Sequence, residues 1–406
     1  MEEKNPTEVG LTPDEPALSV WINMFRWMAS MAVLTSHIRH RLFESYATTR
    51  GDEHSPLFYI VGGASSFGHP AVLIFFILSG FLVGGSSLRR FRKGNGFDLL
   101  DYSTARLSRL WTVLIPALFV TLILNMIGIY VFNGITNGIY DVSVFEGNYN
   151  LVHDPLNFVC NAAFLQTAVC DQYGLNGALW SLFNEFWYYA AWPLIMIAFW
   201  SPRSLGERVV LVAIPMAVLS LLASIQFAGP NVALYFTIWL TGVLAADRAR
   251  PFLPMHPLLA AATLVIGLLV WRIFTRNELW GTSLLTFPID FGIGLLFANM
   301  LMCMKSYAKL PFPPLKRLHG FMAGFSFTVF GIHTPIIHFI CALCMALFGF
   351  GWKMAPVGAT PYLLFFATIV IVQVSAFILS LGTERQMPAL RQFIQNHIVS
   401  RKYALR

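Results

Sequence analysis

Two side chains that can carry charge lie in the first apolar stretch of the chain. Residues 18–38 read LSVWINMFRWMASMAVLTSHI, and a stretch of about 20 residues is long enough to cross a bilayer as a helix. Arg26 and His37 are eleven positions apart in it, which places them about 16 Å apart along the axis and on nearly the same face. Because a charge within the hydrocarbon is costly, such residues usually serve a function. The alternative is that Arg26 reaches the headgroups and His37 is an interfacial end residue.

Two later apolar segments also contain titratable residues. Glu185 follows ALWSLFN near the start of one segment, and His333 stands within FSFTVFGIHTP in another. Counting residues from the helix ends places Glu185 and His37 in the same exterior third of the membrane. We therefore predict that Glu185 lines the His37 cavity and orients the imidazole, as the partner of a base often does. Glu185 could instead bind an acceptor hydroxyl or only its own helix bundle, and His333 could be a packing residue.

A pair of arginines could bind a phosphorylated ligand, and a pair of small residues lies in a neighbouring apolar segment. Arg106 and Arg109 are three positions apart, so both guanidinium groups share one helix face at the membrane surface and could hold phosphate. Ser79 and Gly80 lie in mid-membrane within FFILSGFL. Such small residues allow close helix packing, and a narrow channel could run beside them.

The composition defines the class of protein. With 56% hydrophobic residues, 12% charged residues and a mean hydropathy of +0.63, the 406-residue chain is predicted to be an all-α, polytopic membrane protein. We find no nucleic-acid motif and no internal repeat in it. The acidic N-terminus lacks the basic region of a signal peptide, so we expect the first helix to be retained. About ten spans are predicted, at residues 18–38, 70–88, 111–132, 179–200, 209–227, 231–247, 257–274, 284–304, 321–347 and 360–383.

The distribution of Lys and Arg predicts the orientation. If both termini are cytoplasmic, 20 of the 27 Lys and Arg residues lie on that side and 6 lie outside, with Arg26 in the membrane. We therefore predict a cytoplasmic tail at 1–17, a transmembrane domain at 18–385 and a basic cytoplasmic tail at 386–406. The expected location is the plasma membrane, which in a bacterium is the inner membrane.

The longest segment between spans, about 133–178, is predicted to lie outside. It has no Lys or Arg, and its amide and aromatic residues suit a lid over a sugar, although an ordinary polar loop is the alternative. Residues 155–169 are apolar but too few to span, so we expect them to lie in the interface or to re-enter the membrane. Cys160 and Cys170 fall on the oxidising side, where a disulfide is permitted if their Cα atoms lie within about 7 Å.

Taken together, these motifs resemble the acyltransferase-3 family, whose members are integral membrane O-acyltransferases that modify surface glycans and related acceptors. The matching features follow one another along residues 18–385: Arg26 eleven positions before His37, FFILSGFL, Arg106-x-x-Arg109, LWSL-x-x-Glu185, and Ser326 to Pro335. The chain departs from the family pattern at Asn23, where many members have Asp, and at Phe327 and Phe330, where Tyr is frequent.

The resemblance implies that His37 is catalytic, that Arg26 is required and that Arg106 and Arg109 bind the acyl-CoA donor. Adding the other residues by their positions in the chain gives the following expected site for acyl transfer without a metal. The catalytic set would be His37, Glu185 and Arg26. The donor, acyl-CoA, would be bound by Arg106, Arg109, Ser79 and Gly80. The acceptor would be bound by Trp180, Ser181 and His333.

The predicted reaction moves an acyl group, most simply acetyl, from cytoplasmic acyl-CoA to a hydroxyl of an exterior glycan or glycolipid. His37 would take the hydroxyl proton as general base, while a covalent acyl-histidine relay is a second route. The expected partners are membrane lipid, acyl-CoA and the glycan acceptor, and a homodimer is left open. The alternatives are a proton-coupled transporter or exporter of a polysaccharide or lipid-linked sugar, and an inactive relative that only binds glycan.

Overall fold

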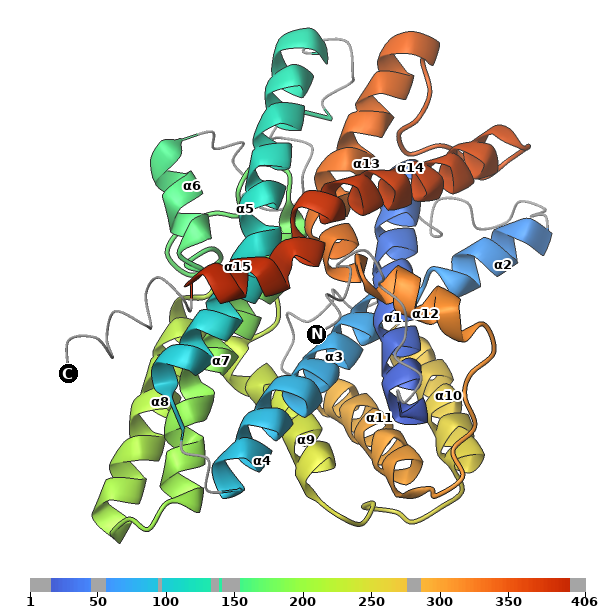
Figure 1. Ribbon diagram of the computed structural model, residues 1–406. Coiled ribbons are helices and arrows are strands. Elements are labelled where there is room, and N and C mark those ends of the chain that lie inside the picture. The colour runs from blue at the N-terminus through green and yellow to red at the C-terminus, as the bar shows by residue number, and fades with distance from the viewer. Residues whose placement is uncertain are drawn as a thin grey trace, which may run out of the picture.

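The computed structural model describes residues 16–44, 56–93, 97–132, 139–140, 154–275 and 286–394, and within these ranges it is built from helices without strands (Figure 1). Every one of the ten predicted spans coincides with a helix. These helices are α1 (Ala17–Leu42), α3 (Gly68–Ser79) with α4 (Gly85–Arg92), α5 (Leu99–Phe132), α7 (Trp180–Trp200), α8 (Leu205–Ile225), α9 (Val232–Asp247), α10 (Pro257–Phe274), α11 (Phe287–Ser306), α13 (Ser326–Phe348) and α14 (Thr360–Gly382).

Eight helical segments in the described part of the chain are long and apolar enough to cross a membrane. The two predicted spans that are not among these eight are α9, which is apolar but has only 16 residues, and α7, which is rich in Trp and Tyr. The structure thus confirms an all-α, polytopic membrane protein. The two tails lie largely outside the described residues, and the side on which the termini lie stays a prediction.

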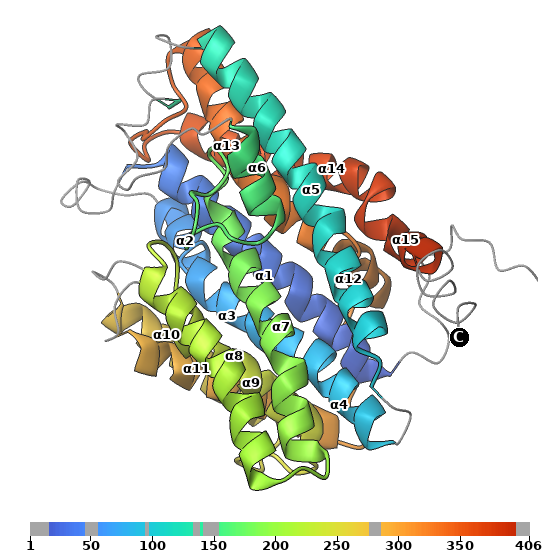
Figure 2. The same ribbon diagram turned by 90° about the vertical axis from the view of Figure 1, so that its left-hand side faces the viewer.

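Short helices complete the fold. They are α2 (Pro56–Ala64), α6 (Pro155–Ala162), α12 (Lys316–Ala323) and α15 (Met387–Ile394), and single 3₁₀ turns are formed by Gly177–Leu179 and Glu384–Gln386. Figure 2 shows that α1, α3, α5 and α7 run side by side, with α15 near the end of the bundle at which α5 begins. The helix α1 packs against α3, α12 and α13, so it lies near the centre of the bundle.

Two helices are longer than predicted. The helix α1 continues to Leu42 because three basic residues in its last turn, Arg39, His40 and Arg41, suit the negative end of the helix dipole. The helix α5 begins at Leu99, where the Asp98 carboxylate accepts a hydrogen bond from the backbone N–H of Leu100 at 2.8 Å. His37 is therefore more than a turn inside α1, deeper than the penultimate position that the sequence predicted.

Gly80 lies at a close contact between two helices. A π-helical turn at Gly80–Gly84 joins α3 to α4, and a Cβ atom on Gly80 would lie 2.0 Å from the carbonyl oxygen of Trp239 in α9. Gly242 of α9 approaches the carbonyl oxygen of Ile77 equally closely. The two glycines thus let the backbones of α3 and α9 touch, as small residues do between membrane helices. The predicted contact of Gly80 with the donor is not supported by this position.

The apolar segment before α7 lies against the bundle. The helix α6 runs antiparallel to α5, because Phe158 contacts Phe119 at a ring separation of 5.2 Å while the Ala162 carbonyl accepts a hydrogen bond from Trp111 at 2.9 Å. The irregular backbone that follows is buried against protein, which is the condition for such backbone at membrane depth. Within its described part, this segment packs against the bundle, and whether it lies in the interface or re-enters the membrane stays a prediction.

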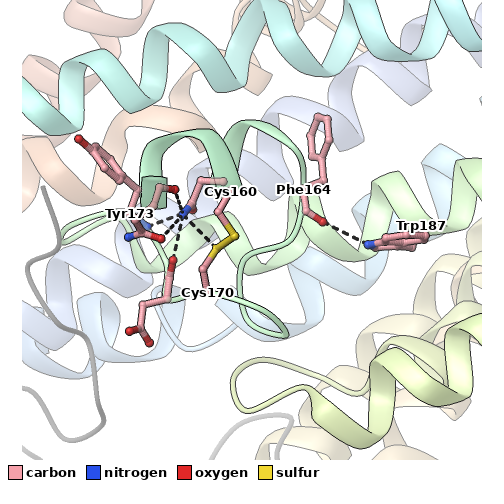
Figure 3. The surroundings of a disulfide bond; sticks show 8 residues. Cys160, Phe164, Cys170, Tyr173 and Trp187 are labelled. Atoms are coloured by element: carbon pink, nitrogen blue, oxygen red, sulfur yellow. Dashed lines mark hydrogen bonds between the residues drawn. A yellow bond between two sulfur atoms is a disulfide. The ribbon is translucent and has the colours of Figure 1, made fainter. Parts of the chain in front are cut away.

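A disulfide closes this segment. Cys160 and Cys170 are bonded, with their Cα atoms 6.5 Å apart, as the sequence permitted (Figure 3). Asn161 joins the same two arms, since its Nδ2 donates to the Asp171 carbonyl at 2.9 Å and its Oδ1 accepts from the Tyr173 N–H at 3.0 Å. The bridge therefore lies beside the middle of α5, and not in a loop that projects from the bundle.

Removing the disulfide is expected to destabilise the protein. Replacing Cys160 and Cys170 with serine should lower the free energy of unfolding by about 2–3 kcal/mol, because the bridge closes a short loop. Thermal unfolding in detergent, with and without reductant, measures the effect. Cys303→Ser is the control, since Cys303 is a buried free thiol and this variant should keep the reductant response of the wild type. A wild-type midpoint that ignores reductant and equals that of the double variant would contradict the expectation.

Candidate active site

The imidazoles of His37 and His333 are in direct contact. Nδ1 of His37 lies 2.9 Å from Nε2 of His333, and Nδ1 of His333 lies 2.8 Å from the Phe330 carbonyl oxygen. A carbonyl can only accept, so Nδ1 of His333 carries the hydrogen and its Nε2 is left to accept from His37. This assignment leaves Nε2 of His37 unprotonated, and it has no hydrogen-bond partner among the described residues. His37 is thus held as a base with one free lone pair.

A proline in α13 frees a backbone carbonyl close to His333, and a side chain from another segment binds this carbonyl. Pro335 has no N–H, so the carbonyl of Gly331, four residues earlier in α13, lacks its helical hydrogen bond. Nδ2 of Asn176 donates to this carbonyl at 2.9 Å and to the Thr121 hydroxyl at 3.1 Å. Asn176 therefore ties the segment before α7 to the turn of α13 that carries His333.

A mainly apolar pocket with several charged and polar side chains lies between α1, α3, α5, α7 and α13, near the start of α13. Its central free volume is about 50 Å³, which holds a few heavy atoms. Two cations, Arg26 and Arg109, line it together with the Glu185 carboxylate and three serines. The remaining lining residues are apolar or aromatic and include Phe75, Phe327 and Phe330.

Glu185 belongs to this pocket and is not the partner of His37. Its carboxylate accepts a hydrogen bond from the Ser79 hydroxyl at 3.0 Å and another from the Tyr189 hydroxyl. The prediction that Glu185 orients His37 was wrong, because His333 occupies that place. The sequence estimate failed because α1 is longer than predicted and because residue counts give depth but not the interface that a side chain faces.

Glu384 is a residue of this region that the sequence did not reveal. Its Oε1 lies 3.9 Å from a guanidinium nitrogen of Arg26, and its Oε2 accepts from the N–H and hydroxyl of Thr328, both at 2.9 Å. It therefore neutralises Arg26 and caps the first turn of α13 at once. An acidic neighbour of Arg26 is thus present, although the chain has Asn23 where many family members have Asp.

The two arginines of α5 lie differently. Arg109 lines the pocket, with its Cζ atom 6.0 Å from the centre of the Phe327 ring. Arg106 lies one turn nearer the start of α5, over the Tyr102 ring at 5.7 Å, and its buried Nε has no hydrogen-bond partner. A nitrogen that lacks a partner in such a place is available to an anionic ligand.

An aromatic side chain separates the pocket from the histidines. Phe330 lines the pocket, contacts Phe75 at a ring separation of 5.7 Å and lies 5.8 Å from the His333 ring. Of the predicted acceptor residues, Ser181 lines the pocket and His333 contacts His37. The third, Trp180, does not line the pocket and packs against Phe76 at 6.1 Å.

Comparison with known proteins shows the family to which the chain belongs. Residues 19–382 match the family described as an acyltransferase domain, so the chain belongs to the acyltransferase-3 family that its motifs resemble. An O-acetyl transferase of Shigella phage Sf6 is 27% identical over 238 residues, which are 53% of this chain and 62% of that protein. The match thus spans less than two thirds of that relative. No solved structure matches the chain.

Proposed function

We propose that the protein is an O-acyltransferase of the bacterial inner membrane, which moves an acyl group from cytoplasmic acyl-CoA to a hydroxyl of an exterior glycan or glycolipid. One observation carries the proposal: His37 is held with a free Nε2 next to a pocket that contains two guanidinium groups. Such a base can accept the proton of an attacking hydroxyl, and guanidinium groups can bind the phosphates of a CoA thioester. The acetyltransferase name of the phage relative supports acetyl as the acyl group, and the small free volume suits it.

The reaction follows from this arrangement. The acceptor oxygen attacks the thioester carbon while its proton passes to Nε2 of His37, and the collapse of the tetrahedral intermediate releases the CoA thiolate. The imidazolium that forms keeps its Nδ1–H directed at Nε2 of His333, which stabilises the new charge. Arg26 and Arg109 would attract the phosphates and the developing negative charge of the donor. An acyl-histidine relay would use the same free Nε2 as nucleophile.

The first test combines two measurements. Purified protein should release CoA from acetyl-CoA, and cells that lack the gene should lose acyl esters from their envelope glycans by mass spectrometry. A transporter or exporter would release no CoA. If purified, folded protein releases none and the envelope glycans are unchanged, the proposed activity is wrong.

The donor pocket makes a separate prediction. Arg109→Ala should raise the KM for acetyl-CoA by about tenfold or more, with a smaller rise for the acceptor, because a charged contact to phosphate is lost. Arg106→Ala should act in the same direction. Arg208→Ala is the matched control, because it removes an exposed arginine that lies far along the chain from these motifs. A correctly inserted double variant with an unchanged donor KM would show that these arginines do not bind the donor.

A further inference from the structure

Three buried amide side chains beside α13 have polar atoms without partners. Both polar atoms of Asn125 in α5, both of Gln172 and Oδ1 of Asn176 make no hydrogen bond, and all three side chains are at most 1% exposed. In the same segment Asn161 uses both ends of its amide, whereas Asn157 and Gln166 each leave one buried polar atom without a partner. Buried amides without partners are unfavourable, and in natural proteins they need an explanation such as a bound polar molecule.

The three amides gather at one place. Gly174 has a φ of +54°, and a Cβ atom on it would lie 1.9 Å from Nδ2 of Asn125, so only a glycine lets this amide approach the backbone. Asn176 reaches the Thr121 hydroxyl, one helical turn before Asn125. Gln172 is two residues before Gly174 in the chain, and its Oε1 lies 3.5 Å from the position of a Cβ on Gly177, the residue that follows Asn176.

This group lies close to the histidine pair. Nδ2 of Asn176 bonds the carbonyl of Gly331, while Nδ1 of His333 bonds the carbonyl of Phe330, the neighbouring residue in α13. Two such bonds to adjacent carbonyls of one helix place the Asn176 amide within about 10 Å of the His333 ring. That separation is about the size of one or two sugar rings.

We propose that Asn125, Gln172 and Asn176 bind the hydroxyl groups of the acceptor, a neutral polyhydroxylated molecule such as a sugar unit. The inference rests on the proposed function and adds where its acceptor is held. Amides supply donors and acceptors in equal number and no charge, which matches hydroxyl groups better than phosphate or an apolar chain. The acceptor hydroxyl next to those bound here would face His37. Because the amides are covered in this structure, entry of the acceptor requires the 171–177 segment to move away from α5.

The experiment compares an unpaired amide with a paired one. Asn125→Leu removes the unpaired amide at similar volume, and Gln172→Met does the same on the facing segment. In cells that lack the chromosomal gene, each variant should lower the acyl ester content of envelope glycans by about tenfold. Acetyl-CoA binding to the purified variants should equal that of the wild type, and their thermal midpoints should be equal or higher. Asn161→Leu, the matched control, should lower the midpoint.

Each other result overturns the proposal. Unchanged glycan acylation in both variants would show that the amides do not hold the acceptor. A lowered midpoint, as in Asn161→Leu, would show that they satisfy one another or water as structural groups. The wild type distinguishes failure of the proposed function from failure of this subsite. If the wild type neither binds acetyl-CoA nor acylates glycans, the proposed function is wrong. If the wild type acylates glycans and both variants do so equally well, only the proposed acceptor subsite is wrong.

Discussion

Replacing His37 with alanine is expected to lower kcat for acyl transfer by about 10²–10⁴-fold, the usual contribution of a general base. The physical reason is the free Nε2, which is the only nitrogen of the pair that can take a proton from a substrate hydroxyl. Acetyl-CoA binding should change little, since His37 does not line the cationic pocket. Release of CoA by purified protein, together with the dissociation constant of acetyl-CoA, measures both effects.

Variants of two further histidines serve as a comparison and a control for this prediction. His333→Ala should also lower kcat, but by less, because His37 remains and loses only its orientation. His319→Ala is the control, since His319 is buried and bonded to Trp27 at 3.0 Å and to the Pro314 carbonyl at 2.7 Å, away from the pair. A His37→Ala variant with the rate of the wild type would exclude both the base and the acyl-histidine mechanism.

Loss of the Glu384 carboxylate is expected to be the most damaging change to stability in the site. Glu384→Ala leaves Arg26 without its ion-pair partner and removes two hydrogen bonds from Thr328, so the free energy of unfolding should fall by about 3 kcal/mol. Transfer should fall too, because Arg26 would no longer be held at the pocket. The thermal midpoint and the rate of CoA release are the measurements.

A conservative variant separates the two roles of this residue. Glu384→Gln keeps a side-chain oxygen for Thr328 but lacks the charge, so it should recover only the part of the stability that the Thr328 hydrogen bonds contribute, while the rate stays low. In a double-mutant cycle with Arg26→Ala, the coupling should be about 0.5–3 kcal/mol. Additive effects of the two changes on the free energy of unfolding would show that the ion pair at 3.9 Å does not contribute to stability.

The sequence predicted the helices well because their signal is local. Long apolar segments fix the existence of membrane helices, and each predicted span coincides with one. The relation between Arg26 and His37 was also local, since one helix carries both. The bond between Cys160 and Cys170 could be anticipated because only ten positions separate them.

The partners of these residues could not be predicted because they depend on helix packing. Glu384 reaches Arg26 from the other end of the chain, and no spacing rule connects them. His333 and Glu185 were both recognised as buried titratable residues, but their depths alone did not tell which of them faces His37. Pro335 in the sequence predicts that the Gly331 carbonyl lacks its helical hydrogen bond, but it does not predict which side chain donates to that carbonyl. The structure shows that the donor is Asn176.

The ion pair between Arg26 and Glu384 joins the first membrane helix to the residues that follow the last one, and this has a consequence for biosynthesis. Because α1 is synthesised first, Arg26 lacks Glu384 as a partner until every later span has been made. A nascent chain that stops anywhere before Glu384 therefore contains Arg26 without this ion-pair partner. The environment of the first membrane helix is therefore completed only by the residues that follow the last one, so folding of this region has to wait for the end of translation.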